Sequence, residues 1–392
     1  MINKHIDRLQ KLSAQLISYQ TTADRPDEIA KCLHWVSNYI SAHVPSAHII
    51  ELESQGKKSL FITHATLQPK IIFCAHLDVV ATHNPNLFTA VCEPNGRLVG
   101  RGAADMKGPA AALLDIFVEE ANPDIGLLFT ADEEVGGENG AKYFLKIIDW
   151  QPEVVILPDG GANMRLITEQ KGILRIQLDA TGQSAHSARP WLGDNAILRL
   201  SRAYEALLRK YPIPMYEDDW RVSITLTQIN GGSAPNVVPL AAIGTLDIRY
   251  PFTSQEAAMK LYQSVCAIVK RFQVTPTLVS YAGGFALDIF ASAVDVFQNI
   301  AERTLGAKLP LSREAGASDA RFFSERNIAS LMYQPVCGGW HTEYEWVDMQ
   351  SLYQFHQLTS QFTAAYSDFS NSALDICSGS YSDTADIAIK EA

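Results

Sequence analysis

The stretch IIFCAHLDVV (71–80) decides how the first part of this chain folds. It opens with a short apolar run, and similar runs follow at IGLLF (125–129) and VVIL (154–157). Between the first two runs, the alanine- and leucine-rich segment 107–121 is typical of a buried helix, and Pro109 suits its first turn. Short apolar runs that alternate with helices predict an α/β fold with a parallel sheet.

The middle of the chain has a different order of elements. We expect strands at 172–180, 221–229, 240–249 and 273–280, and helices at 195–210 and 254–271. This βαββαβ order is typical of a ferredoxin-like α+β unit. After Gly283 and Gly284 the alternation returns, with a helix at 289–305, a strand at 328–333 and a helix at 349–366.

We therefore predict an α/β protein with two domains. Residues 1–170 and 283–392 form a main domain with a mixed, mostly parallel sheet, and residues 171–282 form a smaller ferredoxin-like domain inserted between them. A chain of 392 residues with 47% hydrophobic content exceeds what one core usually organises. The tail from about Asp368 has weak periodicity, and we assign it no function.

The composition argues against several classes of partner. The net charge of −11 opposes binding to nucleic acid or to an anionic membrane, because contacts with phosphate need a positive field. No apolar run approaches the roughly 20 residues that cross a bilayer, and residues 1–20 resemble an amphipathic helix more than a signal peptide. The six cysteines are dispersed, which favours free, reduced thiols. We therefore expect a cytoplasmic protein.

Potential metal ligands follow each of the three apolar runs. The carboxyl ends of strands in an open α/β sheet share one crevice, so side chains from different strands can converge there. Asp105 joins them from the loop GRGAADMKG (100–108), whose glycines allow sharp bends. The candidates at the strand ends are His76 and Asp78, then Asp132, Glu133 and Glu134, then Asp159.

Carboxylates gathered in this way would repel one another and raise one another's pKa unless a cation lies between them. A divalent metal removes that repulsion. Imidazole and carboxylate ligands suit zinc at a catalytic site, although other first-row metals accept the same ligands. The dispersed cysteines argue against a structural zinc site.

Each candidate also has a simpler explanation when it is considered alone. His76 could be a surface or capped histidine, and the acidic residues 132–134 could be a solvated turn that complements a helix dipole. Asp159, in the sequence PDGG, could be a turn residue. The joint placement of these residues at three strand ends favours a metal site.

The motifs resemble those of a known enzyme family. HLDVV (76–80), GRGAADMKG (100–108), TADEEVGG (130–137) and GGWHTE (338–343) are similar to motifs of the dizinc aminoacylase and carboxypeptidase family, in the family's order. That family includes acetylornithine deacetylase, succinyl-diaminopimelate desuccinylase, glutamate carboxypeptidase and several dipeptidases. The resemblance implies a zinc-peptidase-like catalytic domain, with the inserted domain as a lid and dimerisation domain.

The resemblance also implies the roles of the site residues. Two zinc ions per subunit are expected, with Co²⁺ as a substitute, and Asp105 would bridge them. His76 and Asp159 would hold one ion, and Glu134 and His341 would hold the other. Asp78 would sit behind His76 and fix its tautomer. Glu133 would be the general base that takes a proton from the shared water.

Further residues are implied in the lid and near the substrate. His186, in GQSAHSARP (182–190), would stabilise the oxyanion, and in dimeric relatives this histidine comes from the partner subunit. Lids of this type usually also form the dimer contact, so we expect a homodimer. Asn236, Arg249, Gly316 and Ser318 match positions that hold the substrate's carboxylate, where Arg249 could bind it bidentately. Alternatively, Ser318 and Asp319 could cap the helix that follows, and Arg249 could pair with a surface acid.

Three other classes of protein are disfavoured or left open. GRGAAD (100–105) lacks the third glycine of a dinucleotide loop and does not follow a convincing strand, and no GxSxG elbow marks a covalent hydrolase. A non-catalytic descendant would be expected to lack Glu133 or a ligand. Within the family, Asp159 favours a small peptide or N-acyl amino acid as substrate, because deacetylases and desuccinylases typically carry glutamate there. The deacylase activity remains the alternative.

Overall fold

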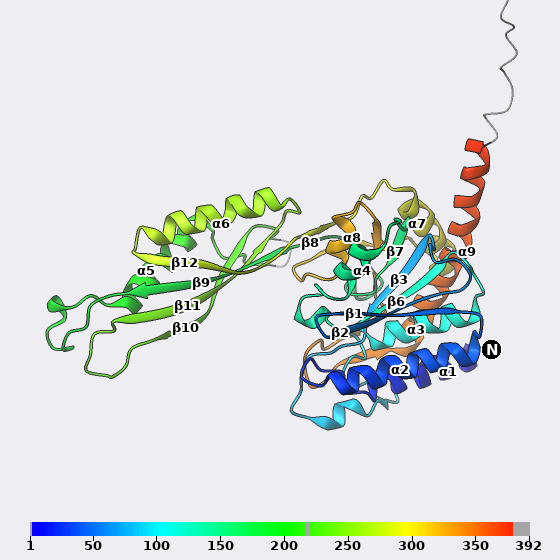
Figure 1. Ribbon diagram of the computed structural model, residues 1–392, viewed down its shortest axis with the longest axis horizontal. Helices are drawn as coiled ribbons and strands as arrows, with labels where there is room; N and C mark the ends of the chain where they lie inside the picture. The colour runs from blue at the N-terminus through cyan, green and yellow to red at the C-terminus, as the bar shows by residue number, and fades with distance from the viewer. Residues whose placement is uncertain (1, 217–218, 379–392) are drawn as a thin grey trace, which may run out of the picture.

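The computed structural model describes residues 2–216 and 219–378, and these form two lobes joined by a narrow connection (Figure 1). The large lobe contains both ends of the described chain. The small lobe contains β9 (Gly172–Thr181) to β12 (Val274–Ala282) and projects away from the large lobe.

A mixed six-stranded sheet forms the centre of the large lobe, in the order β1-β2-β6-β3-β7-β15. β3 pairs in parallel with both β6 and β7, and β7 pairs in parallel with β15, which confirms the expected mixed sheet with parallel strands. The antiparallel part of this mixed sheet lies at one edge, where β1 and β2 form a hairpin and β2 pairs with β6. The strands are β1 (His48–Ser54), β2 (Lys57–Thr63), β3 (Ile71–His76), β6 (Ile125–Thr130), β7 (Val154–Ile156) and β15 (Ala329–Leu331).

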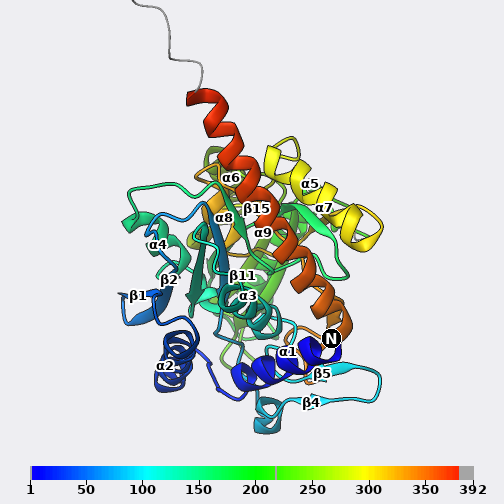
Figure 2. The same cartoon turned by 90° about the vertical axis from the view of Figure 1, so that its right-hand side faces the viewer.

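Helices cover this sheet, and α1, α3 and α9 pack against one another (Figure 2). α3 is buried almost throughout, which explains its run of alanines and leucines. The helix expected at 349–366 continues to Ser378, so the weak periodicity after Asp368 belongs to a helix; residues 379–392 of the predicted tail lie outside the described residues. The helices are α1 (Ile2–Ile17), α2 (Pro26–His43), α3 (Lys107–Glu119), α4 (Ala141–Ile147), α7 (Ser292–Leu305), α8 (Ala320–Ser324) and α9 (Met349–Ser378).

Two small sheets complete the large lobe. One has the order β13-β8-β14, and the other has the order β16-β17-β5-β4. β5 comes directly before the loop 100–108, where we expected no convincing strand, although it is only three residues long. Their strands are β4 (Val91–Cys92), β5 (Arg97–Val99), β8 (Leu166–Gln170), β13 (Phe285–Ala286), β14 (Leu311–Glu314), β16 (Cys337–Gly338) and β17 (Trp346–Asp348).

The small lobe has a hydrophobic core of its own. Its antiparallel sheet has the order β10-β11-β9-β12, and two helices, α5 and α6, pack on it. Alternate residues of β9 face this core, so Leu174, Ile176 and Leu178 are fully buried. The remaining elements are α5 (Ala196–Lys210), β10 (Ser223–Gly231), β11 (Ala241–Tyr250) and α6 (Gln255–Lys270).

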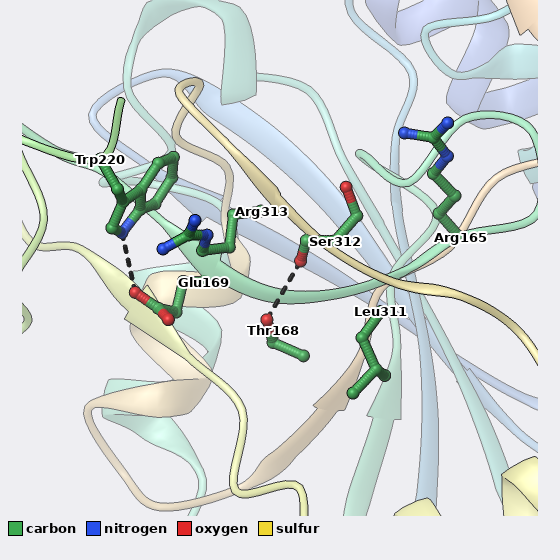
Figure 3. Close-up of a pocket in the computed structure, with 7 residues that line it drawn as sticks. All are labelled: Arg165, Thr168, Glu169, Trp220, Leu311, Ser312 and Arg313. Atoms are coloured by element: carbon green, nitrogen blue, oxygen red, sulfur yellow. Dashed lines mark hydrogen bonds between the residues drawn. The ribbon is translucent and has the colours of Figure 1, made fainter. Parts of the chain in front are cut away.

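Two chain crossings connect the lobes, one from β8 to β9 and one from β12 to β13. At the second crossing a side chain on Gly284 would lie 2.7 Å from the carbonyl oxygen of Phe252, so only glycine fits there. A polar pocket of about 540 Å³ lies beside the first crossing (Figure 3). In it the indole Nε1 of Trp220, from the small lobe, donates a hydrogen bond of 2.8 Å to Glu169.

Cations also face the ring of Trp220. Lys171 Nζ and the guanidinium carbon of Arg313 each lie 4.9 Å from its centroid. Trp220 therefore makes a polar and a cation–π contact with strands β8 and β14 of the large lobe.

The cysteines form no disulfide bonds within the described part of the chain. The free cysteines are Cys32, Cys74, Cys92, Cys266 and Cys337, and the side chain of Cys377 lies outside the described part.

Among the described residues, none of the helices has the length and apolar character that a bilayer crossing requires.

Candidate active site

One cluster of potential metal ligands forms where β3 and β7 end. His76 is the last residue of β3 and is buried, and its Nε2 lies 3.0 Å from Oδ1 of Asp105. Asp159 follows β7 and completes this group of ligand atoms, which all lie within 4.8 Å of one another.

A second cluster shares Asp105 with the first. Nε2 of His341 lies 3.3 Å from Oδ2 of Asp105 and 3.4 Å from Oε2 of Glu134. His341 sits in the turn between β16 and β17, with a positive φ of 60°. Each oxygen of Asp105 therefore faces a different histidine, and the two clusters meet at this carboxylate.

The electrostatics of the two clusters fit a pair of divalent cations. Burial and the nearby Asp105 carboxylate raise the pKa of Asp159, and its buried Oδ2 has no hydrogen-bond partner among the described residues. Hydrogen bonds to Asp105 and Glu134 raise the pKa of His341 to about 10. Such repulsion between carboxylates and an unsatisfied oxygen mark a place where a cation would be favourable. The imidazole and carboxylate donors suit zinc.

Glu133 lies beside these clusters, in the short 3₁₀ helix η2 (Glu133–Val135) after β6. Burial and the carboxylate of Asp159 raise its pKa. The helix ends at Gly136, which has a φ of 116°, and Gly137 follows with a φ of 66°. These conformations favour glycine and turn the chain sharply after the two glutamates.

Asp78 holds this turn in place. Its carboxylate accepts hydrogen bonds from the backbone N–H groups of Glu133, at 3.3 Å, and Glu134, at 3.0 Å. The Nδ1 atom of His76 lies 3.0 Å from the Asp78 carbonyl oxygen and 3.6 Å from its Oδ1. Within the described structure, Asp78 therefore contacts both the ring of His76 and the loop that carries Glu133.

Asp132 has a different position from the other strand-end acids. Its carboxylate accepts a hydrogen bond of 2.8 Å from the backbone of Asn139 and belongs to neither ligand cluster. Asp132 therefore shapes the loop 132–140.

Three buried polar residues near the site were not among the predicted site residues. Glu345 accepts hydrogen bonds from the backbone N–H groups of Ala104 and Asp105, and Arg101 donates to it. Asp319 is also buried, and burial raises its pKa to about 7. The contacts of Glu345 join segments that are distant in sequence, so no local spacing could have indicated them.

The structure does not bring His186 or Asn236 to the clusters. Both residues lie in loops at the end of the small lobe that is far from the crossings, where the backbone of Ser187 donates to the Asn236 carbonyl. β9 has ten residues and starts at the crossing, so its far end is roughly 30 Å away. His186 is exposed there.

The other residues expected near the substrate's carboxylate have partners within the chain. Arg249 donates a hydrogen bond of 2.7 Å from Nε to Asp247, as the surface-pair alternative anticipates. Ser318 donates to Gln170 at 2.7 Å and accepts from the backbone of Ala320 at the start of α8. Gly316 lies in the exposed loop before it.

Two histidines and three carboxylates therefore lie together beside the carboxyl ends of the strands of a mixed sheet. This arrangement is typical of a metallohydrolase. The chain belongs to peptidase family M20/M25/M40, whose model matches residues 72–365. This confirms the resemblance found in the motifs and makes the protein a metallohydrolase that acts on amide bonds.

Curated relatives of this chain are named as carboxypeptidases and as a desuccinylase. A probable carboxypeptidase of Aspergillus terreus is 32% identical over 199 residues, which cover 47% of this chain and 46% of that protein. A succinyl-diaminopimelate desuccinylase of Rhodospirillum centenum is 30% identical over 308 residues, which cover 71% of this chain and 78% of that protein. The chain therefore matches about half of the first relative and more than two thirds of the second.

Solved structures of the family share the fold. An M20 family metallo-carboxypeptidase of Sulfolobus solfataricus superposes with a TM-score of 0.75 at 15% identity, covering 90% of this chain and 98% of that one. A dipeptidase of Saccharomyces cerevisiae gives a TM-score of 0.70 at 15% identity, covering 93% and 96%.

Proposed function

We propose that this chain is a dizinc hydrolase that cleaves the amide bond of a small peptide or N-acyl amino acid with a free carboxylate. The observation that carries the proposal is the position of Asp105, whose two oxygens lie 3.0 Å from His76 and 3.3 Å from His341. His76 and Asp159 would hold one zinc ion, and Glu134 and His341 the other, with Asp105 shared. Co²⁺ accepts the same ligands.

Two zinc ions held at these residues would lower the pKa of a shared water towards neutrality and polarise the scissile carbonyl. Glu133 is then the base that takes the water's proton and later delivers it to the leaving amine. Hydrogen bonds from the backbone of Glu133 and Glu134 to the Asp78 carboxylate fix the turn that carries both glutamates.

The small lobe acts as a lid and dimerisation domain in this proposal. His186 would donate a hydrogen bond to the oxyanion that forms at the substrate, an interaction worth about 3 to 4 kcal/mol at comparable sites. Because His186 lies at the far end of the small lobe, we propose that it reaches the site of a second copy of the chain in a homodimer.

The substrate's free carboxylate would be held by Arg249, with Gly316 and Ser318 on the large lobe. Asn236 lies beside His186, so it would reach this carboxylate from the second copy of the chain together with His186. Arg249 would exchange its contact with Asp247 for a bidentate contact with the substrate. Aspartate at position 159 and the relatives named carboxypeptidase favour peptide-type substrates. The similarity to the desuccinylase of Rhodospirillum centenum supports deacylation of an N-acyl amino acid as the second candidate activity.

Bound metal and hydrolysis measured together test the mechanism. Wild type and Glu133→Ala, each loaded with zinc or cobalt, should both bind about two metals per chain, and only wild type should turn over. A wild type without bound metal, or an equally active variant, would overturn the proposal and favour a binding protein or a different base.

A substrate panel separates the two candidate activities. Dipeptides are assayed beside acetylornithine and succinyl-diaminopimelate with the same zinc-loaded preparation. Turnover of dipeptides supports the peptidase activity, whereas turnover of only the two acyl amino acids assigns the protein to the deacylases.

A further inference from the structure

A buried ion pair outside the proposed ligand set contacts the loops of both Asp105 and His341. We propose that Glu345 and Arg101 are positioning residues that set the geometry of these two ligands and thereby the affinity of the site for metal. This inference rests on the proposed function, because it assigns a task to residues around the proposed metal ligands.

Glu345 fixes the backbone that carries Asp105. Its side chain is 1% exposed, and its Oε1 accepts hydrogen bonds from the N–H groups of Ala104 and Asp105, both at 3.0 Å. The backbone N–H of Gly100 also donates to the Glu345 carbonyl oxygen, at 2.9 Å. The loop before the shared ligand is therefore held at both its start and its end by one residue.

Arg101 extends this arrangement to His341. Nη1 of Arg101 lies 2.7 Å from Oε2 of Glu345, and its Nη2 donates a hydrogen bond of 3.0 Å to the carbonyl oxygen of Thr342, the neighbour of His341. The His341 side chain is 53% exposed, so burial alone does not hold its ring. The anchored Thr342 backbone therefore limits where the ring of His341 can point.

A carboxylate is the group that this position needs. One oxygen of Glu345 faces two backbone donors and the other faces a guanidinium donor, so both oxygens accept. Glutamine has the same shape but a single acceptor oxygen, so one set of donors would face its NH₂ group in a buried environment. Outer partners that orient metal ligands typically contribute 10- to 100-fold to metal affinity.

The chain offers a matched control. Asp115 is also 1% exposed and pairs with an arginine, with its Oδ1 2.7 Å from Nε of Arg8. This pair joins α1 and α3, and neither residue contacts the loops of Asp105 or His341 in the described structure. Arg8 is 32% exposed, and Asp115 also lies 3.0 Å from Nε2 of His356. Asp115→Asn thus measures what the loss of the charge of a buried, paired carboxylate costs in stability alone.

The experiment measures stepwise zinc affinity by competition with a chromophoric chelator, and the absorption spectrum of the cobalt form, on the full chain. We expect Glu345→Gln to weaken binding of both metals by about 10- to 100-fold, because Asp105 is shared. Arg101→Lys keeps a cation beside Glu345 but loses the fork that reaches Thr342, so it should weaken only the metal of Glu134 and His341. In a His341→Ala background, Arg101→Lys should then have no further effect.

The outcomes are distinct. Affinities within twofold of wild type for both variants, or an equal loss in Asp115→Asn, would overturn the positioning role while leaving the proposed function intact. If Glu345→Gln fails to fold, the site-selective loss in Arg101→Lys decides the matter. A wild type that binds no metal would overturn the proposed function and this inference together.

Discussion

Nε2 of His341 lies 3.3 Å from Oδ2 of Asp105, although Asp105 precedes the small lobe in the chain and His341 follows it. The two segments of the large lobe therefore meet at the candidate site. The proposed metal centre depends on this long-range contact as much as on the local motifs.

Loss of His341 should remove one metal and leave the other. We expect His341→Ala to bind about one zinc per chain, because His76, Asp105 and Asp159 remain. Its kcat should fall by more than the roughly 100-fold that loss of an outer partner costs. Metal analysis and dipeptide assays check this, with the exposed His34→Ala as a control that should match wild type. Two tightly bound metals in His341→Ala would contradict the ligand assignment.

Mixing two inactive variants tests the source of His186. If His186 acts on the site of a second copy, a mixed dimer of Glu133→Ala and His186→Ala contains one complete site, and activity returns on mixing. If His186 acts within its own chain, every site in the mixture lacks one of the two residues and no activity appears. Sedimentation of the mixture shows whether dimers are present, and capture through an affinity tag on one variant shows whether the subunits have exchanged.

The buried Asp319 predicts a pH effect on the stability of the metal-free protein. Burial raises its pKa to about 7, above the value of about 3.9 in an unfolded chain, so the folded state binds the proton more tightly. Its contribution to the free energy of unfolding therefore decreases as the pH rises from about 4 to 7.

Asp319→Asn removes this loss of stability. Its melting temperature relative to wild type should be higher at pH 8.5 than at pH 5, in thermal unfolding of the chelator-treated protein. Asp149→Asn, at an exposed position, should show no such pH-dependent difference. The same relative melting temperature at both pH values would argue against a protonated Asp319.

Trp220→Phe should loosen the connection between the lobes. Phenylalanine keeps an aromatic face for Lys171 and Arg313 but loses the hydrogen bond to Glu169. A loss of about 1 kcal/mol would speed amide exchange in residues 166–172 by about fivefold. Hydrogen-exchange mass spectrometry checks this beside Trp191→Phe, whose indole is 75% exposed. Equal exchange in both variants would show that the indole N–H contributes nothing to the connection.

The elements with a clear apolar run or a clear periodicity could be predicted from the sequence. The buried strands β3, β6 and β7 are uninterrupted apolar runs, and the predicted strands and helices of the small lobe match β9 to β12 within a few residues. The hairpin of β1 and β2 was missed because its strands mix charged and apolar residues. The end of α9 was placed too early because the periodicity weakens after Asp368, although neither glycine nor proline occurs between Asp368 and Ser378 to end the helix.

The candidate site divides in the same way. His76, Asp105, Glu134 and Asp159 stand next to apolar runs or glycine-rich loops, so their convergence follows from the topology of a parallel sheet. Glu345 does not stand next to an apolar run or a glycine-rich loop. Its hydrogen bonds reach Ala104 and Asp105, which precede the small lobe in the chain, whereas Glu345 follows it. Tertiary contacts of this kind leave no local pattern.

The division of the large lobe into two segments also sets an order of events during synthesis. A nascent chain leaving the ribosome exposes His76, Asp105, Glu134 and Asp159 long before His341 and Glu345 exist. Until then the carboxylates face one another without the second imidazole and without the arginine-paired glutamate. Capture of a complete pair of cations therefore belongs to the end of translation, and a prematurely terminated chain is left with half a site.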